Sequence, residues 1–175
     1  MTPPPKTSPH DEWFEIVDEH GSVIGCARRA ACHRNPALLH RVVHVLVLNS
    51  SGALYLQKRS PTKDVQPGKW DTSVGGHVNL RESLDAAAQR ELAEELGIHN
   101  VPLHRLYSYI WESNIERELV TTYLCRYDAT PTPDPHEIEQ GRWWHPDEIH
   151  SALGTGVFTP NFEHEWHRFL AAYKP

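Results

Sequence analysis

The chain has 175 residues, of which 39% are hydrophobic and 23% are charged, and its formal net charge is -6 at pH 7. This length is enough for one domain with a sizeable core. The negative charge argues against a protein that binds nucleic-acid polymers or anionic membranes, because both require a basic face. A small anionic substrate, held locally by a metal ion and a few basic residues, is compatible with this composition.

The N-terminal residues 1–11 are rich in proline and polar side chains, so we expect a mobile tail there and a single domain over residues 12–175. The tail lacks the apolar core of a signal peptide, and no apolar run approaches the ~20 residues of a membrane-spanning helix. The three cysteines (Cys26, Cys32 and Cys125) lack close paired spacing, which indicates reduced thiols. These observations favour a cytoplasmic protein.

Apolar and alternating runs predict that the first third of the chain consists mainly of strands. The strands are expected at residues 13–17 and 22–26, joined as a hairpin, and at 40–48 and 53–57, with loops at 28–36 and 60–69. Residues 42–48 are almost continuously apolar. This pattern is typical of a central strand that is buried on both faces.

Residues 83–96 predict the main helix, because they are rich in Ala, Leu, Glu, Gln and Arg. Gly97 follows at the position where a left-handed residue ends a helix. One apolar stripe is expected on this helix, made by residues spaced four apart: Leu84, Ala88, Leu92 and Leu96. Further along the chain we expect strands at 103–111, 119–127 and 142–144, a short helix from Pro146 and a last helix over 161–173.

Three carboxylates lie beside the apolar stripe of the main helix. Glu91, Glu94 and Glu95 share one arc, since residues three and four apart are neighbours on a helix. At ~4 Å, like charges near a surface cost several kcal/mol per pair. Such a cluster is relieved by a proton or by a hard divalent cation that takes oxygen ligands. The alternative is an exposed acidic face with no ligand.

The same stretch resembles the Nudix box at every fixed position. The matching residues are Gly76, Glu82, Arg90, Glu91, Leu92, Glu94, Glu95, Gly97 and Ile98. The resemblance implies an α+β fold, the Nudix α/β/α sandwich with a central mixed β-sheet. It also implies hydrolysis of a diphosphate linkage that depends on Mg²⁺ or Mn²⁺ held by Glu91, Glu94 and Glu95, with Arg90 pairing with a glutamate of the box.

A wider resemblance links the chain to type 1 isopentenyl-diphosphate isomerases. Their single-metal site corresponds to five residues here: His33, His40, His77, Glu116 and Glu118. Three imidazoles and two carboxylates suit Mn, Zn or Fe better than Mg. We treat these residues as candidates for a second metal site, the alternative being surface or hydrogen-bonded histidines.

Two departures argue against isomerase activity. The isomerases place a catalytic cysteine where this chain has Gly75, and glycine can neither give nor take a proton. They also carry an arginine at the position of Glu91, so the hydrolytic box is complete here and degraded there. The resemblance therefore favours a hydrolase, with an isomerase and a non-catalytic nucleotide-binding module as alternatives.

Substrate contacts are expected from basic and glycine residues. Arg59 and Lys63, by resemblance to the isomerases, and Lys69 are candidates for phosphate contacts, and Gly75 and Gly76 permit a tight loop whose N–H groups approach phosphate. The expected substrate is a nucleoside diphosphate derivative or a related small diphosphate. A homodimer is compatible with the sequence.

Overall fold

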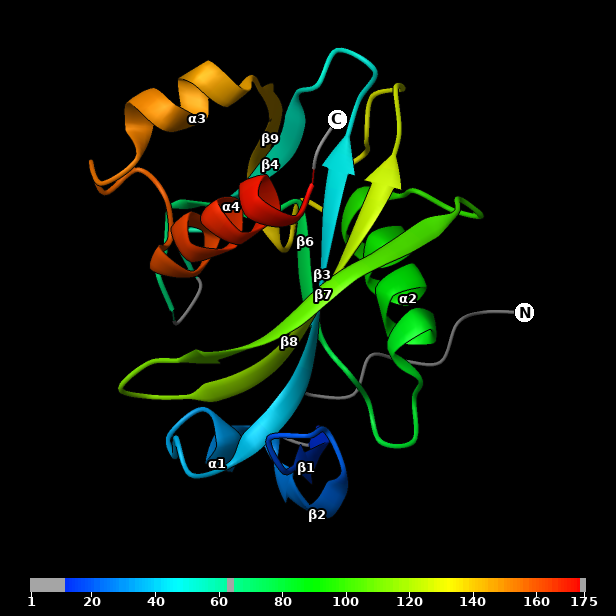
Figure 1. The fold of residues 1–175 in the computed structure, drawn as a ribbon, viewed down its shortest axis with the longest axis vertical. Coiled ribbons are helices and arrows are strands. Elements are labelled where there is room, and N and C mark those ends of the chain that lie inside the picture. The colour runs from blue at the N-terminus through cyan, green and yellow to red at the C-terminus, as the bar shows by residue number, and fades with distance from the viewer. Residues whose placement is uncertain (1–11, 63–64, 174–175) are drawn as a thin grey trace.

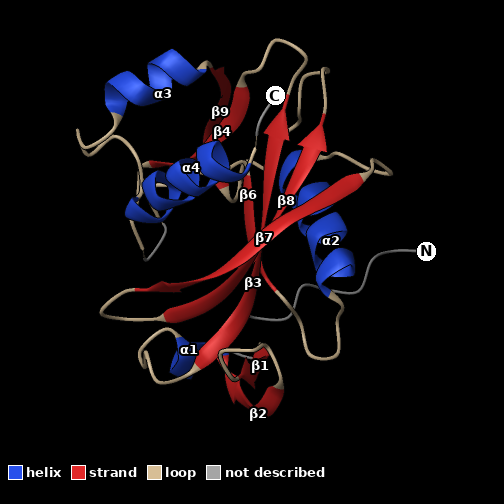
Figure 2. Cartoon of the chain, in the orientation of Figure 1, coloured by secondary structure: helices blue, strands red, loops and turns tan. Residues whose placement is uncertain are grey.

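The computed structural model describes residues 12–62 and 65–173. Its elements are β1 (Trp13–Val17), β2 (Val23–Arg28), α1 (Arg29–Cys32), β3 (Leu39–Leu48), β4 (Leu54–Arg59), β5 (Trp70–Asp71), β6 (Val74–His77), α2 (Leu84–Leu96), β7 (Leu103–Glu112), β8 (Arg117–Arg126), β9 (Ile138–Trp144), α3 (Pro146–Ala152) and α4 (Pro160–Ala172). Figures 1 and 2 show these elements. The expected tail over residues 1–11 lies outside the described residues. No helix of the described part is long and apolar enough to cross a membrane.

Strand β3 is the centre of a mixed sheet. It pairs in parallel with β8 along its whole length, from Leu39 opposite Arg117 to Leu48 opposite Arg126. On its other side, β3 pairs antiparallel first with β6 and then, at its C-terminal end, with β4. Strand β7 extends the sheet beyond β8, and β9 extends it beyond β4. The predicted central strand is therefore confirmed.

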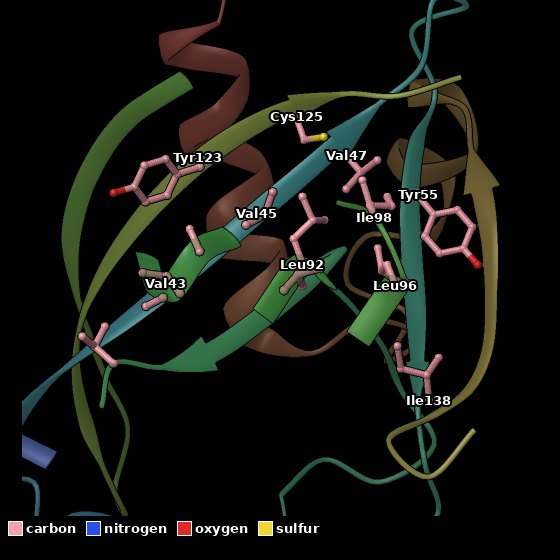
Figure 3. Packing of buried hydrophobic residues seen from close by; sticks show 14 residues of the cluster. Val43, Val45, Val47, Tyr55, Leu92, Leu96, Ile98, Tyr123, Cys125 and Ile138 are labelled. Atoms are coloured by element: carbon pink, nitrogen blue, oxygen red, sulfur yellow. The ribbon is translucent and has the colours of Figure 1, made fainter. Parts of the chain in front are cut away.

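The two faces of β3 pack against different helices. Its odd-numbered residues Val43, Val45 and Val47 join a core with residues of α2 (Figure 3). Its even-numbered residues Leu46 and Leu48 join a second core with residues of α3 and α4. Because side chains alternate along a strand, helices cover both faces. Figure 1 shows α2 and α4 on different sides of the central strands, as in the expected α/β/α sandwich.

Helix α2 begins and ends where its sequence predicts. Ser83 is the N-cap, and its hydroxyl accepts a hydrogen bond from the N–H of Ala86 at 3.2 Å. Gly97 ends the helix in the left-handed region, with φ of 65°. This precise placement fixes the rotation of α2, and hence which carboxylates face the sheet.

Three local predictions were wrong. The expected loop at 28–36 contains α1, a helix of one turn that is too short to show a helical period. The last strand begins at Ile138, four residues before the predicted start at 142, because β9 pairs with the whole of β4. Gly75 and Gly76 form no loop: both lie in β6, paired with His44 and Val43 of β3.

Candidate active site on both faces of strand β6

Strand β6 has one face toward α2 and the other toward α4. Gly76 lies opposite Val43, and so faces α2. Gly75 and His77 lie opposite His44 and Val42, on the face that carries α4. Consecutive residues of one short strand thus contribute to two different groups of polar side chains.

On the α2 face, Gly76 lies directly against Glu91. A β-carbon on Gly76 would overlap the carboxyl group of Glu91. The glycine is therefore required by the close approach of this carboxylate to the strand, and not by a turn. Burial raises the pKa of Glu91, the positive charge of Arg90 partly offsets this, and the charges of Glu94 and Glu82 add to the rise.

Arg90 organises the acidic residues of α2. Its Nε and Nη2 donate to the two carboxylate oxygens of Glu82, each at 2.8 Å. Its Nη1 donates to Glu91 at 2.6 Å and to Glu94 at 3.4 Å. Its Nη2 also donates to the backbone carbonyl of His77 at 3.0 Å. This side chain therefore joins the acidic helix to β6, and it pairs with a glutamate of the box as the sequence predicts.

The three glutamates of the box do not converge in the expected compact cluster. Glu95 is buried and accepts a hydrogen bond from the Nε2 of Gln57 at 2.9 Å. The side chain of Glu94 is 46% exposed. The described residues do contain a group of potential metal ligands whose ligand atoms lie within 4.8 Å of one another. That group is made of histidines and not of the glutamates of α2. Arg90 binds Glu91 and Glu94 through one nitrogen, whereas Gln57 binds Glu95.

On the α4 face, His33, His40 and His77 form that group. The Nε2 atoms of His33 and His77 are 3.1 Å apart. Phe14 of β1 stacks on His77, with ring centroids 4.4 Å apart, and on His40 at 5.4 Å. Three imidazoles from residues up to 44 positions apart in the chain thus lie close together, and the buried ring of Phe14 packs against them.

His40 has an unsatisfied buried nitrogen. Its ring is 0% exposed, and its Nδ1 lies 3.3 Å from the carbonyl of Leu38. A carbonyl only accepts, so Nδ1 carries the proton and Nε2 has the lone pair. That Nε2 has no hydrogen-bond partner among the described residues. Burial lowers the pKa of His40, which keeps the ring neutral, as a metal ligand must be.

Two carboxylates complete this group. Glu116 lies 3.9 Å from the Nδ1 of His33, and Glu118 lies 4.0 Å from the Nε2 of His40. Burial, together with the charge of Glu116, raises the pKa of Glu118 to about 8. A divalent cation would relieve both the repulsion between these carboxylates and the unsatisfied Nε2. The donor set therefore fits a divalent metal that accepts nitrogen and oxygen, such as Mn, Zn or Fe.

Comparisons with known proteins identify the family of the chain. A model of the NUDIX domain matches residues 38–162. The chain belongs to the Nudix family. It is 35% identical over 153 residues to an isopentenyl-diphosphate Delta-isomerase of Nocardia farcinica, and the aligned region covers 83% of this chain and 87% of the relative. It is 33% identical over 151 residues to a Nudix hydrolase of Deinococcus radiodurans, and the aligned region covers 83% of this chain and 86% of that relative.

A crystal structure from Deinococcus radiodurans superimposes on the chain with a TM-score of 0.81 and 28% identity, covering 93% of this chain and 100% of that one. The relatives thus include both Nudix hydrolases and isopentenyl-diphosphate isomerases, as the motifs predicted. Membership of the Nudix family does not by itself decide between the two activities.

The basic residues expected to bind phosphate have different positions. Arg59 is half-buried, and its guanidinium donates to Asp71 at 3.1 Å and to the carbonyl of Val65 at 3.0 Å. Its charge acts on Glu116 and Glu118, so it lies at the histidine side of the site. Lys63 lies outside the described residues. The ammonium of Lys69 makes no ion pair within the described part of the chain.

Sequence reasoning missed several residues of the site. Phe14 was assigned only to a strand, and Gln57, although part of the stretch that resembles the isomerases, was given no role. Phe14 stacks on His77, and Gln57 donates to Glu95. Asp71, which binds Arg59, was not considered. Little in the sequence marks these residues, because each one acquires its contact from a segment distant in the chain.

Proposed function

We propose that this Nudix protein hydrolyses a diphosphate linkage in a nucleoside diphosphate derivative or a related small diphosphate, with a divalent metal ion. One observation supports this most strongly. The glutamates of α2 are complete and Glu91 lies against Gly76, whereas the adjacent Gly75 has no side chain that could carry a proton. The acidic helix of a hydrolase is thus present, and the acid of an isomerase is absent.

Glu91, Glu94 and Glu95 would hold Mg²⁺ or Mn²⁺, and the three histidines with Glu116 and Glu118 would hold a second ion. A bound divalent ion neutralises phosphate charge and lowers the pKa of a coordinated water. Arg90 holds Glu91 in position and neutralises part of its charge. Arg59 supplies positive charge on the histidine side, and a carboxylate, from α2 or Glu118, takes the proton from the attacking water.

The test is a panel of small diphosphates incubated with Mg²⁺ or Mn²⁺, in which released phosphate and nucleoside monophosphate are measured. Glu91→Gln and Glu95→Gln should each lower kcat by about a hundredfold or more, since each removes a charge from the proposed metal site. The matched control is Glu139→Gln, which changes a surface glutamate paired with Lys58. Full activity in Glu91→Gln and Glu95→Gln would exclude this assignment.

An isomerase is the second candidate, because the histidine and carboxylate group is assembled and the Nocardia farcinica relative is an isomerase. Incubation with isopentenyl diphosphate separates the two activities. We expect no dimethylallyl diphosphate, because Gly75 occupies the position of the isomerase cysteine. Its formation at a rate that exceeds diphosphate cleavage would establish the isomerase instead.

A further inference from the structure

A buried carboxylate lies on the α4 face of the sheet, beyond the histidine group. Glu165 of α4 is 0% exposed. Its Oε1 accepts from the hydroxyl of Tyr107 at 2.6 Å and of Thr122 at 2.9 Å. Its Oε2 accepts from the hydroxyl of Tyr109 at 2.6 Å and from the Nδ1 of His44 at 2.8 Å. Four donors from three strands therefore converge on one side chain, an arrangement that the hydrolysis described above does not use.

The bond to Glu165 sets the orientation and the tautomer of His44. Burial raises the pKa of Glu165, but the hydrogen bonds from His44 and the tyrosines lower it on balance, so the carboxylate is ionised. An ionised carboxylate only accepts, and the Nδ1 of His44 therefore carries the proton. The same logic holds an imidazole in place in a catalytic triad.

The opposite edge of the ring faces Gly75. A β-carbon on Gly75 would lie 3.4 Å from the Cδ2 and 3.5 Å from the Nε2 of His44. Because Gly75 has no side chain, β6 places only backbone beside this edge of the imidazole, and His44 is 5% exposed. Within the described part of the chain, Nε2 has no hydrogen-bond partner, and it is not among the nitrogens that are sealed from solvent.

The charged and titratable groups around His44 come from every element packed against it. They are Glu165 of α4, Tyr107 and Tyr109 of β7, Glu118 of β8 and Asp71 of β5. Burial lowers the pKa of His44, but the hydrogen bond and charge of Glu165, with smaller effects of Asp71 and Glu118, raise it on balance. Burial and Glu165 raise the pKa values of both tyrosines, which stay protonated.

We propose that His44, as an imidazolium paired with Glu165, is a catalytic residue whose Nε2–H contacts the substrate beside Gly75 and protonates the oxygen that leaves phosphorus, while Glu165 is a positioning residue. This inference rests on the proposed hydrolysis. Water forms a bond to phosphorus, and the bond from phosphorus to the bridging oxygen breaks. The bridging oxygen takes the Nε2 proton, a carboxylate of the site takes the proton of the attacking water, and solvent returns a proton to His44.

Two amide replacements of His44 separate this role from simple packing. The nitrogen of Asn can take the place of Nδ1 and donate to Glu165, but Asn has nothing at the position of Nε2. Gln reaches the position of Nε2 with an N–H that cannot be transferred. With the best substrate of the panel, His44→Asn should lower kcat about a hundredfold or more. His44→Gln should lose kcat similarly but keep KM within about threefold of wild type, since the donor remains.

Glu165→Gln tests the positioning role. It should lower kcat and shift the alkaline limb of the pH profile to lower pH, because the charge that raises the pKa of His44 is gone. A residue that only fills space would not move this limb. His136→Gln, a change at an exposed loop histidine, is the matched control and should leave kinetics unchanged. A kcat within about threefold of wild type in His44→Asn would overturn the proposal.

The proposal can be tested even if the hydrolysis is not observed. If wild type cleaves no diphosphate, the proposed function fails, and binding of α,β-methylene-ADP with Mg²⁺ is then measured by calorimetry. A loss of about tenfold or more in affinity for His44→Asn supports the contact at Nε2. Equal affinities, or no binding by wild type, overturn it.

Discussion

The two faces of β6 carry polar groups that are stabilised in opposite ways. On the α2 face, Arg90 already supplies a positive charge to Glu82, Glu91 and Glu94. On the α4 face, the Nε2 of His40 is unsatisfied, and burial together with the charge of Glu116 raises the pKa of Glu118 to about 8. The charge of the acidic helix is therefore partly neutralised by Arg90, whereas the histidine group gains most from an added cation.

This difference shows that a recognisable motif and a prepared ligand site are separate properties. The Nudix box fixes Arg90 and the glutamates on one helix, and it can be read from spacing alone. The histidine group depends on β1, β3, β6 and β8 meeting in space. We expect a tightly held transition metal on the α4 face and a more weakly held Mg²⁺ or Mn²⁺ on the α2 face.

The largest expected effect is on metal content. His40→Phe fills the volume of the buried ring but removes both nitrogens, so the metal that copurifies should fall about tenfold or more. Atomic absorption or mass spectrometry of the purified protein measures this. His104→Phe, a change at an exposed histidine of β7, should retain the wild-type content. Equal metal content in both variants would show that the histidine group is not the site.

The next effect compares the two glycines of β6. Gly76→Ala places a β-carbon into the carboxyl group of Glu91, so kcat should fall about a hundredfold or more, as displacements near 1 Å do elsewhere. Gly75→Ala places a methyl group in van der Waals contact with the edge of His44 that we propose contacts the substrate, but it displaces no neighbour, so we expect a smaller loss of about tenfold. Steady-state kinetics and melting temperatures decide this. A larger effect at Gly75 would reverse the assigned importance of the two faces.

Much of the fold could be predicted because its signals are local. The apolar run of β3, the caps Ser83 and Gly97 and the stripe of α2 are all read within one segment. The helix α1 could not be predicted, because a single turn shows no helical period. The start of β9 could not be predicted either, because it is set by the pairing of β9 with β4. Gly75 and Gly76 of β6 were wrongly predicted to form a loop. Glycine is required both in tight turns and where another group packs closely against a strand, and the sequence does not distinguish the two cases.

The candidate site was predicted where spacing alone sets geometry, as for Arg90 and Glu91. It was missed where a residue gains its role from a distant segment. The sequence nevertheless contains two signals for the pair of His44 and Glu165, which was not predicted. Glu165 falls on the side of α4 that carries Phe162, Trp166 and Phe169, and His44 interrupts the apolar run of β3. A carboxylate and an imidazole on buried faces predict a partner, although not its identity.

The pair of His44 and Glu165 should make the stability of the fold depend on pH. The pKa of Glu165 is lower in the folded protein than its ordinary value of 4.5, so Glu165 stabilises the fold above pH 4.5. This stabilisation is lost as the pH falls through the pKa of Glu165 in the folded protein. The pKa of His44 is higher in the folded protein than its ordinary value of 6.5, so His44 stabilises the fold below pH 6.5. This stabilisation is lost as the pH rises through the pKa of His44 in the folded protein. Both contributions are complete between these two pH values. Glu165→Gln should therefore cost about 2–3 kcal/mol there, and less at alkaline pH.

Chemical denaturation at pH 5.5 and pH 9 measures this difference. Glu163→Gln, two residues away on the same helix, is the control, because it changes a glutamate that accepts a single bond from the N–H of Gly154 and lies outside the His44 pair. A cost for Glu165→Gln that is the same at both pH values would mean that His44 and Glu165 do not form a charged pair.

The smallest effects compare the N-caps of the two main helices. Ser83 is exposed, and Ser83→Ala removes one hydrogen bond to the N–H of Ala86, so it should cost about 1 kcal/mol. Thr159 is buried, accepts from the N–H of Phe162 at 3.1 Å and donates to Asp71 at 2.8 Å. Thr159→Ala should cost about 2 kcal/mol, because it also removes a donor from the carboxylate that binds Arg59. Denaturant unfolding measures both values, and equal costs would indicate that Asp71 is fully satisfied by Arg59.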